Sequence, residues 1–198
     1  MGSFVFGYSL VLTTILGSTL AAGTKEGFSN SLDEKSLNEK IAMNLSVCTT
    51  ALPLGGLVGS LIYSTVLRAL RSERKSMIWC DLMVIFLYTL QMCSLNPIFV
   101  TFIRFCLGVA MGISCTVVPM YLISISPTKI SGTIGSLNQI LITHGIAVAY
   151  GMGFLIDEKD INCWWRWRIC VLLPACICFL RLITLKIFKY DRLERHIE

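Results

Sequence analysis

The sequence is short of charge, histidine and regularly spaced cysteine. Only 15% of its 198 residues are charged, whereas a soluble domain carries about 25%. Its two histidines, His144 and His196, are too few for the usual zinc or haem sites. Its nine cysteines are odd in number, lie mostly in apolar runs and lack metal-ligand spacing. These shortages argue against a soluble enzyme, a metal centre and a disulfide scaffold. We therefore expect no catalytic residues and no cofactor, and the modest net charge of +5 gives no sign of a nucleic-acid partner.

The sequence is instead rich in apolar residues, which make up 55% of the chain, and its mean hydropathy is +0.71. A bilayer core is crossed by about 20 apolar helical residues. Five runs of that length contain no Lys, Arg, Asp or Glu: residues 1–24, 41–67, 82–103, 105–128 and 130–156. A sixth run, 169–187, is interrupted by Arg181 and Lys186.

We predict six transmembrane helices from these runs, because a lipid-embedded backbone must satisfy its own hydrogen bonds. Asn96-Pro97 and Ser126-Pro127 supply turn signals between successive helices. The first run lacks the basic start of a signal peptide, which favours a retained helix. The prediction is an all-α membrane domain over 1–188 and a tail over 189–198, with helices at about 2–22, 45–66, 76–95, 98–121, 132–153 and 165–186.

Basic residues predict the orientation, because cytoplasmic loops are rich in Lys and Arg. The second connection contains Arg68, Arg71, Arg74 and Lys75, and the C-terminal tail is also basic. Both termini and the tail are therefore expected in the cytoplasm. The outer 23–43 loop is polar, and we expect it to be poorly ordered. A glycosylation sequon at Asn44 abuts the membrane, so we do not expect its use.

Charged residues inside membrane segments are costly and often functional. Arg104, in the fourth predicted helix, has two interpretations that stay open: a structural or snorkelling arginine, and a pairing group beside a polar cavity. Arg181 lies near enough to the inner face to snorkel.

Asp81 lies near the inner end of the third predicted helix. We expect it to form an interfacial ion pair with Arg68, Arg74 or Lys75.

Uncharged polar residues gather in the fifth predicted helix. Gln139 and His144 lie there with Asn138 and Thr143. An amide donates and accepts hydrogen bonds, which suits a polyhydroxylated ligand. Bonding between helices would use the same atoms, so both interpretations stay open. Weaker hydroxyl candidates are Tyr8, Ser9 and Tyr150.

Small residues recur at spacings that let membrane helices approach closely. The sets are Gly55, Gly56 and Gly59; Gly108 and Gly112; and Gly132 and Gly135. Close packing without a specific role is the simplest interpretation of each set.

Several motifs, in order along the chain, resemble the N-terminal half of sugar porters of the major facilitator superfamily, close to facilitative glucose transporters. Arg104, Gly108 and Gly112 resemble the family's R-x-x-x-G-x-x-x-G pattern, and Pro119, Tyr121 and Pro127 its P-x-Y-x-x-E-x-x-P pattern. Further matches are Gly2 to Tyr8 in the first helix, Gly55 to Ser60 in the second, Gly132 to Gly145 in the fifth, and Trp165-Arg166 at the start of the sixth.

The resemblance implies one six-helix half, a 3+3 inverted repeat, of a facilitative hexose transporter in the plasma membrane. It also implies a carrier and not an enzyme. Gln139 falls on the residue that hydrogen-bonds sugar in the family, and Ile142 on an apolar wall position. Arg104, Gly108, Gly112, Pro119, Tyr121, Pro127 and Gly132, with the loop residues Arg74 and Lys75, fall on gating or structural motifs.

Departures from the family pattern affect the gate and the coupling to protons. Ser124 and Ser131 stand where the family has a charged pair at the cytoplasmic gate. Ser9 stands where proton-coupled members place an Asp, which favours downhill transport over proton symport.

The resemblance extends to one half of a carrier only. We expect a half-carrier that needs a homodimer or a second transporter half, within membrane lipid. The alternative is a truncated or regulatory homologue that does not transport, and a polyol or another small metabolite is a further substrate class.

Overall fold

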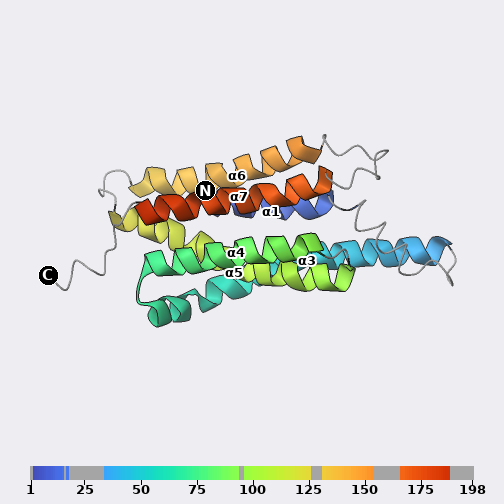
Figure 1. Cartoon of the computed structure of the whole chain (residues 1–198), viewed down its shortest axis with the longest axis horizontal. Coiled ribbons are helices and arrows are strands. Elements are labelled where there is room, and N and C mark those ends of the chain that lie inside the picture. Colours follow the sequence, from blue (N-terminus) through green and yellow to red (C-terminus); the bar gives the residue numbers. More distant parts are fainter. Residues whose placement is uncertain are drawn as a thin grey trace.

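The computed structural model describes residues 2–15, 17, 34–93, 96–125, 131–153 and 166–187, and the regular structure in these ranges is entirely α-helical. The predicted all-α class is therefore confirmed for them. The helices are α1 (Gly2–Ile15), α3 (Glu34–Leu70), α4 (Glu73–Cys93), α5 (Pro97–Ile125), α6 (Ser131–Gly153) and α7 (Arg166–Ile187) (Figure 1).

Helix α3 begins at Glu34, well before the predicted start at residue 45. The expectation of a poorly ordered loop is therefore wrong over residues 34–43. This stretch contains neither Gly nor Pro and is rich in Glu, Lys, Leu, Ala and Met, all of which have good helix propensity. The charges of this stretch indicate only that its residues prefer water, and a helix can carry them into the aqueous phase.

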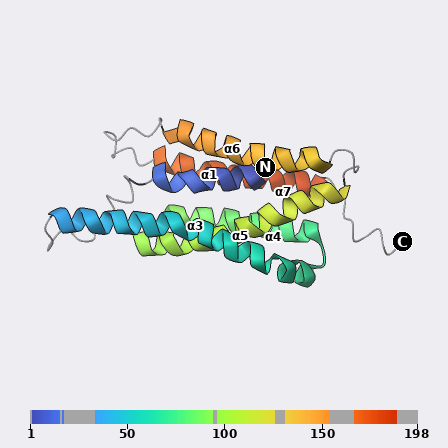
Figure 2. The same cartoon turned by 180° about the vertical axis from the view of Figure 1, so that it is seen from behind.

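The helices form two groups of three: α3, α4 and α5 in one, and α1, α6 and α7 in the other (Figures 1 and 2). The closest packing is of α3 on α5 and of α1 on α6, while α4 packs on α7 and α1 on α5 between the groups. A 3+3 repeat would relate α1 to α5, α3 to α6 and α4 to α7. Under this relation the close pair α3–α5 corresponds to the close pair α6–α1.

Glycines bring the backbones of α3 and α5 together. A Cβ added at Gly55 would collide with the carbonyl oxygen of Phe105, and one at Gly108 with the carbonyl oxygen of Leu52. Gly59 and Gly112 are equally closely packed against the facing helix. Close packing is thus confirmed for these two sets of glycines, as is usual where membrane helices cross.

The α1–α6 pair has the same construction with one glycine on each side. A Cβ at Gly7 would meet the carbonyl oxygen of Ile142, and one at Gly145 would meet that of Phe4. Gly132 and Gly135 have no atom within 4 Å of an added Cβ among the described residues. The close-packing interpretation is therefore wrong for that set.

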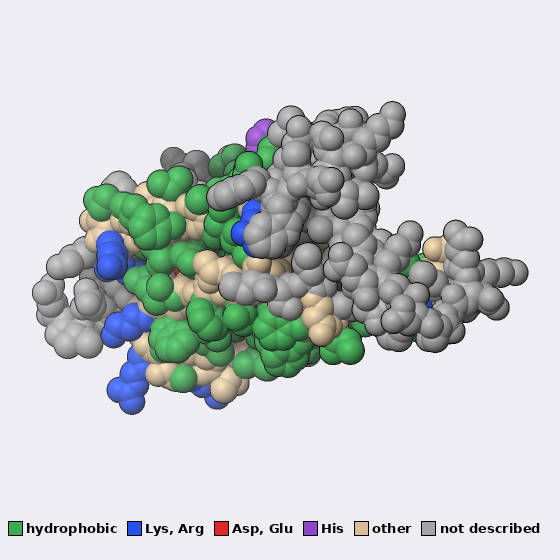
Figure 3. Space-filling model, turned by 45° about the vertical axis from the view of Figure 1, so that its right-hand side comes forward, with side chains coloured by type: hydrophobic (Ala, Val, Ile, Leu, Met, Phe, Trp, Pro, Cys, Tyr) green, Lys and Arg blue, Asp and Glu red, His purple; other side chains and the backbone are tan. Residues whose placement is uncertain are grey.

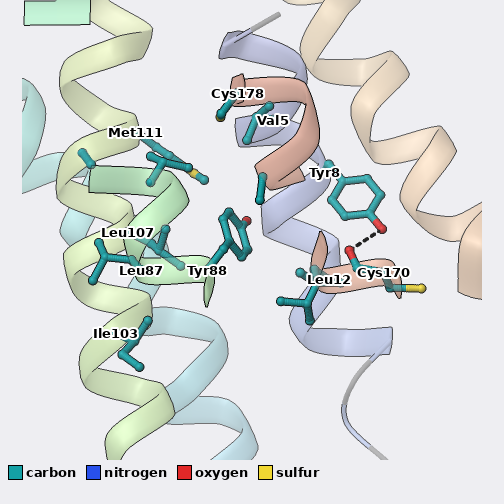
Figure 4. Close-up of a cluster of buried hydrophobic side chains, with 14 of the residues drawn as sticks. Val5, Tyr8, Leu12, Leu87, Tyr88, Ile103, Leu107, Met111, Cys170 and Cys178 are labelled. Carbon is teal, nitrogen blue, oxygen red and sulfur yellow. Dashed lines mark hydrogen bonds between the residues drawn. The ribbon is translucent and has the colours of Figure 1, made fainter. Parts of the chain in front are cut away.

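The core lies where the two groups of helices meet. Tyr8 and Leu12 of α1, Tyr88 of α4 and Leu107 of α5 are fully buried there. Figure 4 shows Tyr88 between the two groups and the hydroxyl of Tyr8 directed at Cys170. The seven cysteines whose side chains the structure describes are unpaired, and four of them are buried, in agreement with a packing role.

Within the described residues, three helices are long and apolar enough to cross a membrane, over 38–70, 98–123 and 168–187. Helix α1 is apolar, but its described part has 14 residues. Apolar side chains cover much of the outer surface in Figure 3, and Leu61, Ile98 and Phe102 are each at least 66% exposed. The chain is thus a membrane protein, and a crossing by each of the six helices stays a prediction.

Candidate functional site

Arg104 lies at the centre of the bundle with none of its surface exposed. Its Nη1 donates to the backbone carbonyl of Ser9 at 3.0 Å and so joins α5 to α1. The hydroxyl of Ser9 donates to the carbonyl of Val5 at 2.6 Å and also contacts the hydroxyl of Tyr88. Arg104, Ser9 and Tyr88 thus form a buried polar centre contributed by α5, α1 and α4.

The burial of Arg104 decides part of the question that the sequence left open. A fully buried guanidinium does not snorkel. Its Nε and Nη2 have no hydrogen-bond partner among the described residues, and an unsatisfied buried donor costs about 1–3 kcal/mol. Nε and Nη2 of Arg104 are therefore available, among the described residues, to donate hydrogen bonds to a further group in the interior of the bundle.

Asp81 pairs with Arg181, so the predicted pairing with Arg68, Arg74 or Lys75 is wrong. Nε of Arg181 donates to the Asp81 carboxylate at 2.7 Å, and Nη2 binds its other oxygen. Lys75 fails as a partner because six residues along a helix is about 240° of rotation, which places it on another face of α4. Arg74, seven residues away, shares the face of Asp81, but its guanidinium binds the Leu185 carbonyl of α7 instead.

The expectation that Arg181 snorkels is also wrong, because its side chain is buried. Its side chain is 9% exposed and that of Asp81 is fully buried. Nη2 of Arg181 also reaches the hydroxyl of Ser114 at 3.4 Å. Gly2 leaves room for the guanidinium, because a Cβ at Gly2 would collide with Nη1. The ion pair therefore connects α4 and α7 and touches α5 and α1.

Arg74 makes a second polar link between α4 and α7. Its Nε and Nη2 both donate to the carbonyl of Leu185, at 3.0 and 2.5 Å. Leu185 lies in the last turn of α7, where backbone carbonyls have no helical partner. Arg74 therefore caps α7, while Lys75 next to it is exposed.

Gln139, the predicted sugar-binding residue, has an exposed side chain on α6. Ser136 and Thr143 lie one turn to either side of it and are exposed as well. Ile142, the predicted apolar wall, is half-buried, and its carbonyl lies against Gly7. Residues 136, 139 and 143 share one helix face, so α6 presents a polar stripe outside the six-helix core.

Two neighbours of Gln139 are engaged in contacts between helices. The Asn138 amide oxygen accepts a hydrogen bond from the hydroxyl of Ser3 in α1. The His144 ring lies 6.0 Å from that of Phe4, also in α1. Of the two interpretations of this polar cluster, bonding between helices holds for Asn138, and Gln139 is left exposed.

Tyr8, one of the weaker hydroxyl candidates, bonds to the backbone. Its hydroxyl donates to the Cys170 carbonyl at 3.0 Å, which joins α1 to α7 (Figure 4). Tyr150 of α6 is exposed.

The remaining motif residues lie mostly on α5. Gly108 and Gly112 form the contact with α3 described above. Pro119 is half-buried within α5, and Tyr121 is buried beside Val117 in a second apolar cluster. Pro127 lies outside the described residues, as do the side chains of Ser124 and Ser131. Gly132 is exposed at the start of α6.

Three features of these polar centres could not be predicted from the sequence: the participation of Tyr88, the participation of Ser114, and the pairing of Arg181 with Asp81. Each of these three residues lies in an apolar run, and its partner is at least 67 residues away in the chain. The useful signal was the presence of two opposite charges, Asp81 and Arg181, inside membrane segments at similar depth.

The described helices place the chain in a class: all-α membrane bundles with buried polar centres. The solved structure of a D-xylose–proton symporter superposes on the chain with a TM-score of 0.76 at 18% identity, covering 100% of this chain and 48% of the other. An inward-open structure of the xylose transporter XylE from E. coli gives 0.75 at 18% identity, covering 96% and 46%. At this identity the likeness shows the fold alone.

The family model described as "Sugar (and other) transporter" matches residues 1–188, and the chain belongs to that family. The sugar transporter ERD6-like 18 of Arabidopsis thaliana is 30% identical over 93% of this chain and 34% of its own length. The solute carrier family 2 facilitated glucose transporter member 5 of Mus musculus is 26% identical over 94% of this chain and 37% of its own. The chain thus spans about a third of these relatives.

Proposed function

We propose that this chain forms one six-helix half of a sugar carrier and acts together with a second half. The observation that carries the proposal is the family match over residues 1–188, together with the exposure of Gln139 on α6. The second half is another stretch of a longer chain, a second copy, or a separate polypeptide.

The polar stripe on α6 supports the need for a second half. Ser136, Gln139 and Thr143 are exposed. The two hydroxyls donate to backbone carbonyls of α6 itself, so the amide of Gln139 is the group that lipid would leave unpaired, at a cost of about 1–3 kcal/mol. Carriers of this fold bind substrate between two halves near the middle of the membrane. A facing half would remove the stripe from lipid and enclose it beside an aqueous path, where sugar hydroxyls can bond to the Gln139 amide.

A hexose is the substrate that we propose. The Gln139 amide offers both donors and acceptors, and Ile142 on the next turn supplies an apolar surface. Sugars present hydroxyls together with apolar C–H faces, so the two side chains match the two kinds of surface.

We further propose that transport is facilitative. Ser9 binds Arg104 through a backbone carbonyl, and the buried carboxylate described elsewhere in the core, Asp81, is held by Arg181. Among the described residues, the Arg104 centre therefore has no carboxylate that takes up and releases a proton.

The basic turn between α3 and α4 supports a cytoplasmic position for that end of the bundle. Arg68, Arg71, Arg74 and Lys75 lie within eight residues, and cytoplasmic loops are rich in such residues. This orientation leaves both termini in the cytoplasm, and we propose the plasma membrane as the location.

Reconstitution tests the proposal. The chain is inserted into liposomes alone and together with a full-length family member, and entry of a labelled hexose is measured with and without a pH gradient. We expect saturable entry that is independent of the gradient. If verified insertion of the chain alone gives no entry, and co-insertion gives no more entry than the full-length member without the chain, the transport proposal is wrong. Entry that the chain alters only when the full-length carrier is present would identify a regulatory homologue.

A further inference from the structure

An apolar groove runs along the outside of α3, α4 and α5. It has a volume of 320 Å³ and is lined by residues that include Val66, Leu70, Trp79, Met83 and Val109. Trp79 is 57% exposed and Met83 is 44% exposed. The groove is therefore open toward the lipid, and its lining suits a hydrocarbon chain.

Basic side chains stand at one end of this groove. Arg71 directly follows Leu70, and Lys75 precedes Trp79 by one helical turn on the same face of α4. Both are exposed, and neither has an ion-pair partner among the described residues. Figure 3 shows Lys and Arg side chains at one end of the molecule beside the apolar surface.

The backbone of Arg71 gives an independent reason to look for a ligand there. Its φ is 52°, and its N–H donates to the carbonyl of Leu67 at 2.9 Å, which ends α3. This left-handed position favours glycine, and for an L-residue with a side chain it costs about 1–2 kcal/mol. Strained positions that persist often have a functional role.

We propose that the groove and its basic end form a binding site for an anionic phospholipid. One acyl chain lies in the groove against Trp79 and Met83, and the lipid phosphate binds Arg71 and Lys75. Anionic headgroups attract basic residues beside a membrane helix. Glu73, the acidic residue of the turn, is half-buried. The proposal requires membrane insertion and does not depend on sugar transport.

Trp79 is a natural reporter of this lipid. The full chain is prepared with Trp164, Trp165 and Trp167 replaced by Phe and is placed in phosphatidylcholine vesicles. A minor fraction of the lipid carries brominated acyl chains, on either phosphatidylglycerol or phosphatidylcholine, and bromine quenches nearby indole fluorescence. We expect phosphatidylglycerol to bind about fivefold more tightly than phosphatidylcholine, or better.

Three variants, each checked for a monodisperse fold, distinguish the site from general surface charge. Lys75→Gln and Arg71→Gly should each lower the preference, although Arg71→Gly relieves backbone strain and should raise the melting temperature. Lys186→Gln removes an exposed charge from the last turn of α7 and should leave the preference unchanged. Equal quenching by both lipids overturns the proposal. A preference that survives Arg71→Gly and Lys75→Gln, or falls as much in Lys186→Gln, also overturns it.

Discussion

Asp81 and Arg181 form an ion pair in the interior of the bundle, 100 residues apart in the chain, with Nε of Arg181 2.7 Å from the carboxylate. The pair joins α4 of the first three helices to α7 of the last three. Because Arg74 also bonds to the Leu185 carbonyl, polar contacts link these two helices at two positions along their length. The α4–α7 contact is therefore fixed by polar groups, whereas α3–α5 and α1–α6 are fixed by close backbone packing.

Removing one partner of the ion pair should destabilise the protein strongly. Asp81→Leu leaves the Arg181 guanidinium buried without its carboxylate, and we expect a loss of about 3–5 kcal/mol. The double variant Asp81→Leu/Arg181→Leu should be more stable than either single variant, because no unpaired charge remains. Thermal unfolding in detergent measures both. Additive losses in the double variant would show that the two charges do not interact.

The fold was largely predictable from the positions of charge-free runs. A segment such as 98–121 carries one charged residue, Arg104, and lipid leaves a helix as the available structure for it. The N-terminal extension of α3 was missed, because absence of charge marks the membrane part of a helix and a helix can continue into water.

The polar contacts were less predictable, because they depend on helix rotation and on distant partners. Asp81 was assigned to neighbours in the sequence, and helix phase directs it to α7 instead. For Arg104, the motif indicated its importance, but its bond to the carbonyl of Ser9 involves a backbone atom that every residue possesses. No residue type signals such a contact.

A second test compares a glycine at a helix–helix contact with an exposed glycine. Gly108→Leu should abolish folding or sharply lower the melting temperature, because its side chain would collide with the backbone of α3 at Leu52. Gly132→Leu is the matched control. Gly132 is exposed, and among the described residues no atom lies within 4 Å of an added Cβ, so this variant should leave the melting temperature nearly unchanged.

Size-exclusion chromatography of both glycine variants after stepwise heating gives the comparison. A Gly108→Leu protein that melts like the unchanged chain would mean that α3 and α5 do not pack as described.

A carboxylate introduced beside Arg104 should make uptake sensitive to protons. Ser9→Asp places an acidic side chain in the polar centre, where Nε and Nη2 of Arg104 have no partner among the described residues. We expect hexose entry in this variant to respond to an imposed pH gradient. Ser9→Asn, which has the same size and no charge, is the control and should remain insensitive. Equal responses of the two variants would argue against a coupling role for this position.

The adjacent residues Gln139 and Asn138 should have opposite effects on transport and stability. Gln139 is exposed, so Gln139→Ala should leave the melting temperature unchanged. Loss of its hydrogen bond to sugar, worth about 1 kcal/mol, should weaken apparent hexose affinity about fivefold. Asn138→Ala removes the bond to Ser3 and should lower stability by about 1 kcal/mol, with little change in affinity. If Asn138→Ala weakens affinity as much as Gln139→Ala, the α6 stripe is not the sugar-binding face.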